Sequence, residues 1–71
     1  MEILKIGDVV TATLFGGHKI IGKIEKIEIT SADSKYGKDV QKCDLSKHAN
    51  GVVDLDNGHW CYFNQIKSKL L

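Results

Sequence analysis

Apolar and polar residues alternate with a period of two along most of the chain, which predicts β-strands. No window carries the i, i+3, i+4, i+7 apolar stripe of an amphipathic helix, so we expect an all-β fold. The stretches that show the alternation are residues 8–15, 18–30, 39–45, 52–56, 59–63 and 66–70. The residues expected on the inward face are Val10, Ala12, Leu14, Gly22, Ile24, Ile27, Cys43, Leu45, Val53 and Leu55.

The second of these strands, residues 18–30, is long, and its alternation breaks once. Ile27 follows Ile24 after three positions instead of two. A β-bulge near residues 25–26 would return Ile27 to the inward face, and it would also bend the strand sharply. The break therefore predicts a bent strand of the kind that a small closed barrel requires.

Glycine and asparagine mark the turns between the strands. Gly16 and Gly17 predict a two-residue hairpin turn, since glycine takes positive φ angles easily. Residues 56–59, Asp-Asn-Gly-His, are the strongest local signal and predict a type I′ hairpin turn. Residues 31–38 are polar and predict a loop, and residues 63–66 predict one short, tight helical turn before the last strand.

Four motifs, GDVVTA, GKIEKI, VDLDNG and CYFNQI, resemble the strands and turns of SH3-like barrels of the Tudor and KOW type. The resemblance covers residues 6–70. It implies a small barrel of five strands, with one extra strand in an insertion at residues 30–50. It also implies that Cys61, five residues before Ile66, points inward.

Two features that would specify a ligand do not accompany this resemblance. A Tudor-type aromatic cage for methylated residues needs several aromatics in two loops, and only Phe15 and Tyr62 come near. The acidic loop and the Trp-Trp pair of a proline-peptide groove are also absent from the sequence. The resemblance therefore concerns the fold and leaves the ligand open.

The length of 71 residues predicts a single domain over residues 1–71. A core of this size supplies only about 3–5 kcal/mol of net stability, which is little to hold a strained, water-excluding catalytic site. We therefore expect a binding protein that is not an enzyme and has no cofactor. No apolar run reaches the ~18 residues that span a bilayer, and the N-terminus does not resemble a signal peptide. This predicts a cytoplasmic protein without a membrane partner.

The charged residues, ten lysines and nine acids, give a net charge of +1. Their signs alternate along the chain, and arginine is absent. Tight binding to a phosphate backbone needs a concentrated basic face, and reading of guanine edges favours the arginine fork. The charge pattern therefore favours a protein partner, with nucleic acid as the alternative.

Trp60 and Tyr62 carry the main binding hypothesis. If Cys61 points inward, both aromatics point outward and form a flat platform. Such a platform can receive a side chain of a protein partner or stack nucleic-acid bases, with lysines from neighbouring segments beside it. The predicted ligand-binding residues are Trp60, Tyr62, Lys42, Lys47 and Lys67. The alternative is that the insertion at residues 30–50, or a second copy of the chain, covers the platform.

A second hypothesis, from another class, is a zinc- or thiol-dependent protein. Cys43, His48, His59 and Cys61 form the pattern C-x4-H-x10-H-x-C, whose residue types suit zinc. Structural zinc sites favour C-x2–4-C or H-x3–5-H spacing, and neither occurs here. His59 is also close enough in sequence to serve Cys61 as a base. We expect two reduced, buried thiols and no metal, with the zinc site as the weaker alternative.

Both ends of the chain are apolar, with Ile3, Leu4 and Ile6 at one end and Leu70 and Leu71 at the other. We expect the two ends to pair. We also expect a homo-oligomer, because self-association through this seam would bury these residues and support a small core.

Overall fold

The computed structural model describes residues 3–30, 37–48 and 50–70. These residues form eight β-strands and two single turns of 3₁₀ helix, which confirms the all-β prediction. The strands are β1 (Ile3–Lys5), β2 (Val9–Thr13), β3 (Lys19–Ile29), β4 (Lys38–Val40), β5 (Lys42–Asp44), β6 (Gly51–Leu55), β7 (Trp60–Tyr62) and β8 (Ile66–Leu70), and the 3₁₀ turns are η1 (Phe15–Gly17) and η2 (Phe63–Gln65). Most of the predicted loop at residues 31–38, and also Leu71, lie outside the described residues. No helix in this part of the chain is long and apolar enough for a membrane crossing.

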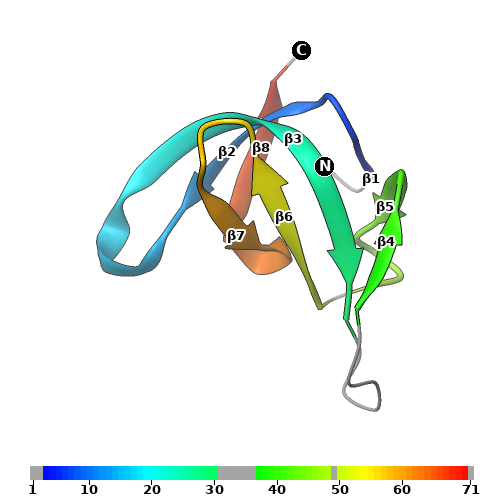
Figure 1. The fold of residues 1–71 in the computed structure, drawn as a ribbon. Coiled ribbons are helices and arrows are strands. Elements are labelled where there is room, and N and C mark those ends of the chain that lie inside the picture. Colours follow the sequence, from blue (N-terminus) through cyan, green and yellow to red (C-terminus); the bar gives the residue numbers. More distant parts are fainter. Residues whose placement is uncertain (1–2, 31–36, 49, 71) are drawn as a thin grey trace.

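Most strands belong to one antiparallel sheet with the order β7-β6-β3-β2-β8 (Figure 1). β4 pairs with the last three residues of β3, on the edge opposite β6. β1 and β5 form a separate two-stranded antiparallel sheet. The main sheet ends at β7 on one side and at β8 on the other, and only η2 connects these two strands.

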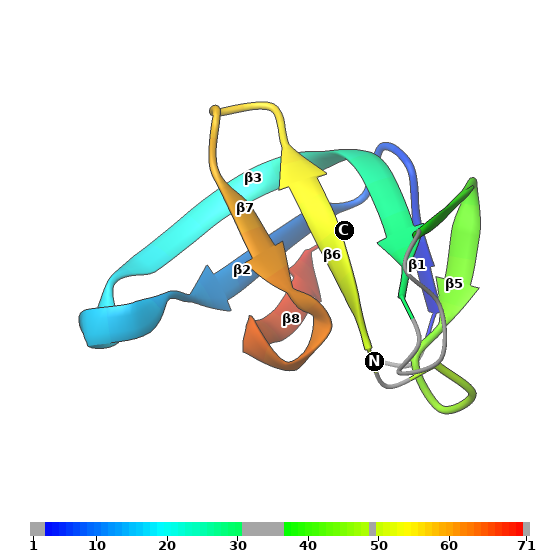
Figure 2. The ribbon, with the colours of Figure 1, turned by 60° about the horizontal axis from the view of Figure 1, so that its bottom comes forward.

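A bulge bends β3 where the sequence predicts it. The register with β6 shifts between Ile24 and Lys26, which leaves Glu25 as the extra residue. The first half of β3 pairs with β2 and the second half pairs with β6, and Figure 2 shows the strand curving along both. Ile24 and Ile27 are consequently both buried. The bulge is what allows one strand to serve both halves of the sheet.

The β2–β3 hairpin turns through three residues, so the predicted two-residue turn is wrong. The Leu14 N–H donates to the His18 carbonyl at 2.7 Å, which closes the hairpin outside η1. Gly16 and Gly17 have φ angles of 83° and 84°, the positive values that favoured glycine in the prediction. The additional loop residue is Phe15, which belongs to η1, so its side chain no longer follows the inward–outward alternation of β2.

The β6–β7 hairpin also has a three-residue loop, so the predicted type I′ turn is wrong. The Leu55 N–H donates to the His59 carbonyl at 2.9 Å. A type I′ turn needs two successive positive φ angles, and here only Gly58 has one, at 85°. The Asn57 side chain instead accepts the His59 N–H at 3.0 Å and donates to the Ile21 carbonyl at 2.8 Å. These bonds tie the turn to β3.

The strand predicted at residues 39–45 is in fact two short strands, β4 and β5. They are separated at Gln41, whose carbonyl accepts the Ile6 N–H at 3.0 Å. β4 pairs with β3 while β5 pairs with β1, so one straight strand cannot serve both partners. Cys43 is buried as predicted, and Leu45 packs against the core.

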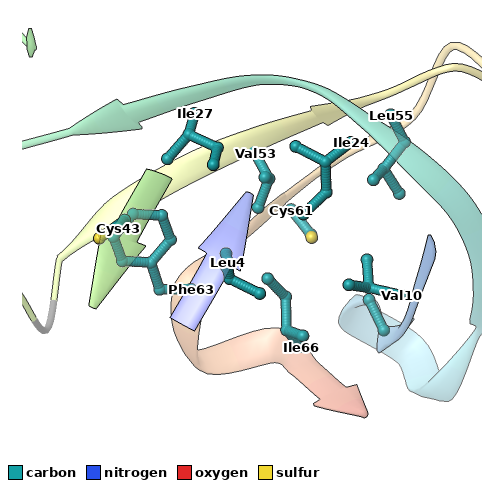
Figure 3. Packing of buried hydrophobic residues seen from close by; sticks show 11 residues of the cluster. Leu4, Val10, Ile24, Ile27, Cys43, Val53, Leu55, Cys61, Phe63 and Ile66 are labelled. Atoms are coloured by element: carbon teal, nitrogen blue, oxygen red, sulfur yellow. The ribbon is translucent and has the colours of Figure 1, made fainter. Parts of the chain in front are cut away.

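One cluster of buried residues forms the core, and every residue predicted to face inward is buried or packs against it. Its members are Leu4, Val10, Ala12, Ile24, Ile27, Cys43, Val53, Leu55, Cys61, Phe63 and Ile66. In Figure 3, Cys43 and Phe63 lie at one end of the cluster and Val10 and Leu55 at the other, with Leu4 between them. The core therefore joins the main sheet to the small β1–β5 sheet.

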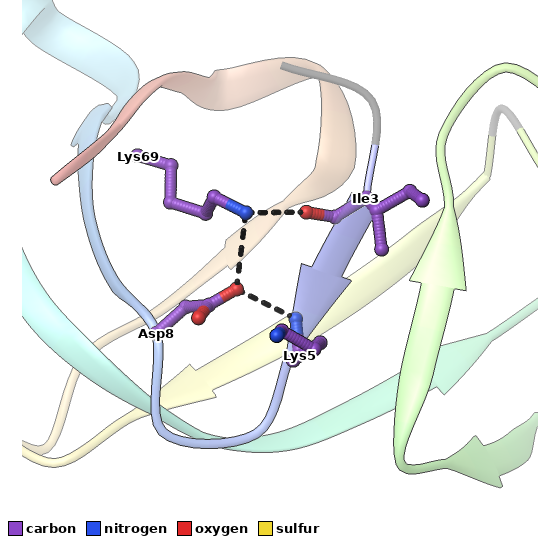
Figure 4. Close-up of polar contacts among 4 residues, drawn as sticks. All are labelled: Ile3, Lys5, Asp8 and Lys69. Carbon is purple, nitrogen blue, oxygen red and sulfur yellow. Dashed lines mark hydrogen bonds and ion pairs between the residues drawn. The ribbon is translucent and has the colours of Figure 1, made fainter. Parts of the chain in front are cut away.

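Within residues 3–70, the first strand and the last strand do not pair with each other, in contrast to the prediction. β1 pairs with β5, and β8 pairs with β2, because Leu4 occupies the core and anchors β1 there. The ends meet through Lys69, whose Nζ donates to the Ile3 carbonyl at 3.2 Å and lies 3.7 Å from Asp8 Oδ2 (Figure 4). The same carboxylate oxygen accepts the Lys5 N–H at 2.9 Å. Asp8 thus fastens β1 to the main sheet.

Candidate functional site

Three aromatic side chains are exposed next to one another where the β2–β3 loop approaches β7. Phe15, Trp60 and Tyr62 are 78%, 50% and 41% exposed. The Tyr62 ring contacts both others, with its centroid 5.2 Å from that of Trp60 and 6.4 Å from that of Phe15. These three residues are termed the aromatic patch. Contiguous exposed apolar side chains of this size mark interaction surfaces in soluble proteins.

The strand β7 directs two of these residues outward. Cys61 is fully buried, so its neighbours Trp60 and Tyr62 point to the opposite face of the strand. β7 is also an edge strand of the main sheet. The described part of the insertion at residues 30–50 leaves both side chains exposed. After β7 the chain turns sharply, because the Gln65 side chain accepts the Tyr62 N–H at 2.9 Å and caps η2.

The rings of the patch pack edge to face. The interplanar angle is 88° between Trp60 and Tyr62 and 69° between Phe15 and Tyr62. This geometry is favourable for aromatic pairs and contributes about 0.5–1.5 kcal/mol each. It also restricts the side chains before a partner arrives, which lowers the conformational entropy lost on binding. Edge-to-face packing thus joins the three rings into one surface.

A groove of about 330 Å³ opens beside the patch. The residues that line this aromatic groove are Leu14, Phe15, Gly58, His59, Trp60 and Gln65. It lies between the β2–β3 loop and the β6–β7 turn, with apolar walls from Phe15 and Trp60 and polar groups from His59 and Gln65. Its volume is at the lower end of ligand pockets, about 300–1,000 Å³, and suits side chains of a partner.

The predicted lysines do not gather around the aromatic patch. Lys42 lies on β5 and Lys47 in the turn that follows it. Figures 1 and 2 both show β6 and β3 between β5 and β7. Lys67 lies on β8 and lines a different groove, together with Lys19. Lys42 and Lys47 are therefore separated from the aromatic patch by two strands, and Lys67 lines a groove other than the aromatic one.

Both cysteines lie in the core as protonated thiols. Cys43 is 2% and Cys61 0% exposed, and both are free. Burial raises the pKa of the Cys61 thiol to about 11. Burial, with a smaller effect of the Asp44 charge, also raises the pKa of Cys43. A nucleophile or a zinc ligand must be a thiolate, so these environments oppose both roles.

The histidines of the zinc hypothesis, His48 and His59, are exposed outside the core that holds the cysteines. Within residues 3–30, 37–48 and 50–70, no three His, Cys, Asp or Glu side chains come together where they could hold a metal ion. The pattern C-x4-H-x10-H-x-C thus receives no geometric support from this part of the chain.

Phe15 is the member of the patch that the sequence hypothesis did not include. The sequence suggested it only as a weak cage residue beside Tyr62. Its position directly before Gly16 and Gly17 was a usable signal, because an apolar side chain in a hairpin loop does not reach the core and stays exposed.

Comparison with known proteins yields no relative for this chain. No protein-family model, no curated protein and no solved structure matches it.

Proposed function

We propose that this protein is a small, non-enzymatic binding module that holds a protein partner at the aromatic patch and in the aromatic groove. One observation carries the proposal: three exposed aromatic side chains contact one another beside a groove of about 330 Å³. Aromatic residues dominate the energetics of protein interfaces, because each buries a large area with few rotatable bonds. An adaptor or an inhibitor needs no more than such a surface.

The walls of the aromatic groove suggest the chemistry of the partner. Phe15 and Trp60 favour an apolar or aromatic side chain inserted between them, which contributes about 1.5–3 kcal/mol when fully buried. His59 and Gln65 can exchange hydrogen bonds with the partner's backbone. Among the residues that the structure describes, no acidic residue and no lysine lines the groove, so an uncharged segment fits best.

The placement of the lysines supports a protein partner over nucleic acid. A stacking platform for single strands works together with a basic groove that follows the phosphates. Here Lys42 and Lys47 lie on the far side of β6 and β3 from β7, Lys67 lines another groove, and the net charge is only +1. Titration of labelled single and double strands at two salt concentrations tests the alternative: tight, strongly salt-dependent binding at the patch would favour nucleic acid.

We further propose that the main sheet is an open variant of the SH3-like barrel. The strand order β7-β6-β3-β2-β8 supports this. In the main sheet β2, β3, β6 and β7 lie side by side in chain order, and only the C-terminal strand, β8, crosses back to pair with the free edge of β2. The position of η2 directly before that last strand supports it as well. The barrel is open because β7 and β8 are not paired with each other.

Selection of peptides from a phage-displayed library against the purified protein tests the proposed function. Selected peptides are expected to carry an apolar or aromatic anchor and to bind Trp60→Ala about thirtyfold more weakly, the loss of a typical interface hot spot. Ile3→Ala is the matched control, because it removes another exposed apolar side chain, 46% exposed, on β1. Unchanged binding to Trp60→Ala, or an equal loss in both variants, would contradict the proposal.

A further inference from the structure

A second groove, of about 430 Å³, lies on β2, β3 and β8 and shares no lining residue with the aromatic groove. Its floor is apolar and its rim carries hydroxyl and ammonium groups. Among the residues that line it are Ala12, Ile20, Ile21, Thr13, Lys19 and Lys67. Ile21 is 54% exposed, more than expected for an isoleucine in the middle of a strand. We term this surface the lysine groove.

The two lysines lie on opposite edges of β2. Lys19 is the register partner of Thr13 in the β2–β3 pair. Lys67 lies on β8, which pairs with the other edge of β2. Neighbouring strands are about 4.8 Å apart, so the two lysine backbones are separated by about 10 Å. Both flexible side chains can therefore reach a ligand that lies over β2 between Thr11 and Thr13.

No carboxylate within the described residues lines this groove. Asp8, at the other end of β2, lies 3.7 Å from Lys69. Asp56 accepts the Lys23 N–H through its Oδ1 at 3.0 Å and holds the β6–β7 turn. In the described part of the chain, the ion pairs involve Lys26 and Lys69 and neither of the groove lysines. The lysine groove thus presents two ammonium groups above an apolar floor.

We propose that the lysine groove binds an acidic segment of a protein partner that carries an aliphatic side chain between its carboxylates. The aliphatic side chain packs on the exposed Ile21, and the flanking carboxylates pair with Lys19 and Lys67. Opposite charge placed on both sides of an apolar contact sets the register of the bound segment.

The composition of the groove argues against two other occupants. Nucleic acid needs bases to stack on aromatic rings and a longer track of cations, and no aromatic residue of the described segments lines this groove. A second copy of the chain that docked the same surface symmetrically would set lysines against lysines.

The test is an NMR titration of the isotope-labelled full chain with a blocked probe peptide, Gly-Asp-Asp-Leu-Asp-Asp-Gly. The backbone amides of Lys19, Ile21 and Lys67 are expected to shift. The affinity is expected to fall when the salt concentration rises from about 30 mM to about 300 mM, because exposed ion pairs are screened. The double variant Lys19→Gln/Lys67→Gln is expected to bind about tenfold more weakly, as loss of two exposed ion pairs predicts.

Two controls separate this inference from general charge effects and from the proposed function. The variant Lys5→Gln/Lys38→Gln removes the same charge from exposed strand residues elsewhere and should bind the probe like the wild type. The variant Trp60→Ala should also bind it normally, because the two grooves share no residue.

Several results would overturn the inference. Absence of shifts at the groove, equal shifts with the probe Gly-Asn-Asn-Leu-Asn-Asn-Gly, or an equal loss in both lysine double variants would each do so. Tighter binding of an oligothymidine strand than of the acidic probe at the same amides would assign the groove to nucleic acid instead.

Discussion

Replacement of Leu4 by alanine tests the role of the N-terminal strand. The Leu4 side chain is 0% exposed and lies at the centre of the core cluster (Figure 3). Removal of a fully buried leucine side chain costs about 2–5 kcal/mol, from lost burial and from the cavity left behind. A chain of this size has only about 3–5 kcal/mol to lose. Leu4→Ala is therefore expected to lose most of its stability or to be unfolded at room temperature.

The assay is chemical denaturation followed by far-ultraviolet circular dichroism, with Ile3→Ala as the matched control. Ile3 lies on the same strand but is 46% exposed, so its truncation should cost less than about 1 kcal/mol. The backbone pairing of β1 with β5 is the same in both variants. A Leu4→Ala variant as stable as Ile3→Ala would refute the reasoning, because β1 would then contribute nothing to the core.

Three further predictions concern packing, thiol ionisation and assembly. Gly51→Ala should cost about 1–3 kcal/mol in chemical denaturation, since a Cβ there would overlap the Phe63 ring and the Glu28 carbonyl; wild-type stability would contradict this. Stability should fall as the pH rises from 9.0 towards about 11, because the unfolded chain loses the Cys61 proton while the folded chain keeps it. Cys61→Ala, itself costing about 1–2 kcal/mol, should show a smaller fall, because Cys43 remains and its pKa is also raised by burial; an identical pH profile would contradict the assignment. Native mass spectrometry should show an oligomer, because apolar side chains at both chain ends stay exposed, and a monomer would refute this.

The strands of the main sheet were predictable because their inward residues form one contiguous core. Ile24 and Ile27 are three positions apart, and only a bulge buries both, so the bend in β3 also follows from the sequence. The outward orientation of Trp60 and Tyr62 depends only on the alternation around the buried Cys61. In each case a local pattern decides the outcome.

The features that escaped prediction depend on contacts between distant segments. β1 has three residues, too few to show an alternation, and it becomes a strand because it pairs with β5. The bend at Gln41 arises because β4 and β5 have different partners. Lys19 was not a candidate in the sequence, and it lies across β2 from Lys67 only because β2 runs between β3 and β8. The Asn-Gly turn departs from type I′ because the Asn57 side chain donates a hydrogen bond to the Ile21 carbonyl of β3.

The fluorescence of Trp60 offers the most direct test of the claim that the aromatic patch binds a partner. Trp60 is the only tryptophan in the chain and is 50% exposed, so its emission reports on the solvent at the patch. Addition of a peptide selected by the wild-type protein should shift the emission to shorter wavelength and saturate at the affinity measured independently, because the indole leaves water. An emission spectrum that stays unchanged while the peptide binds would contradict the account.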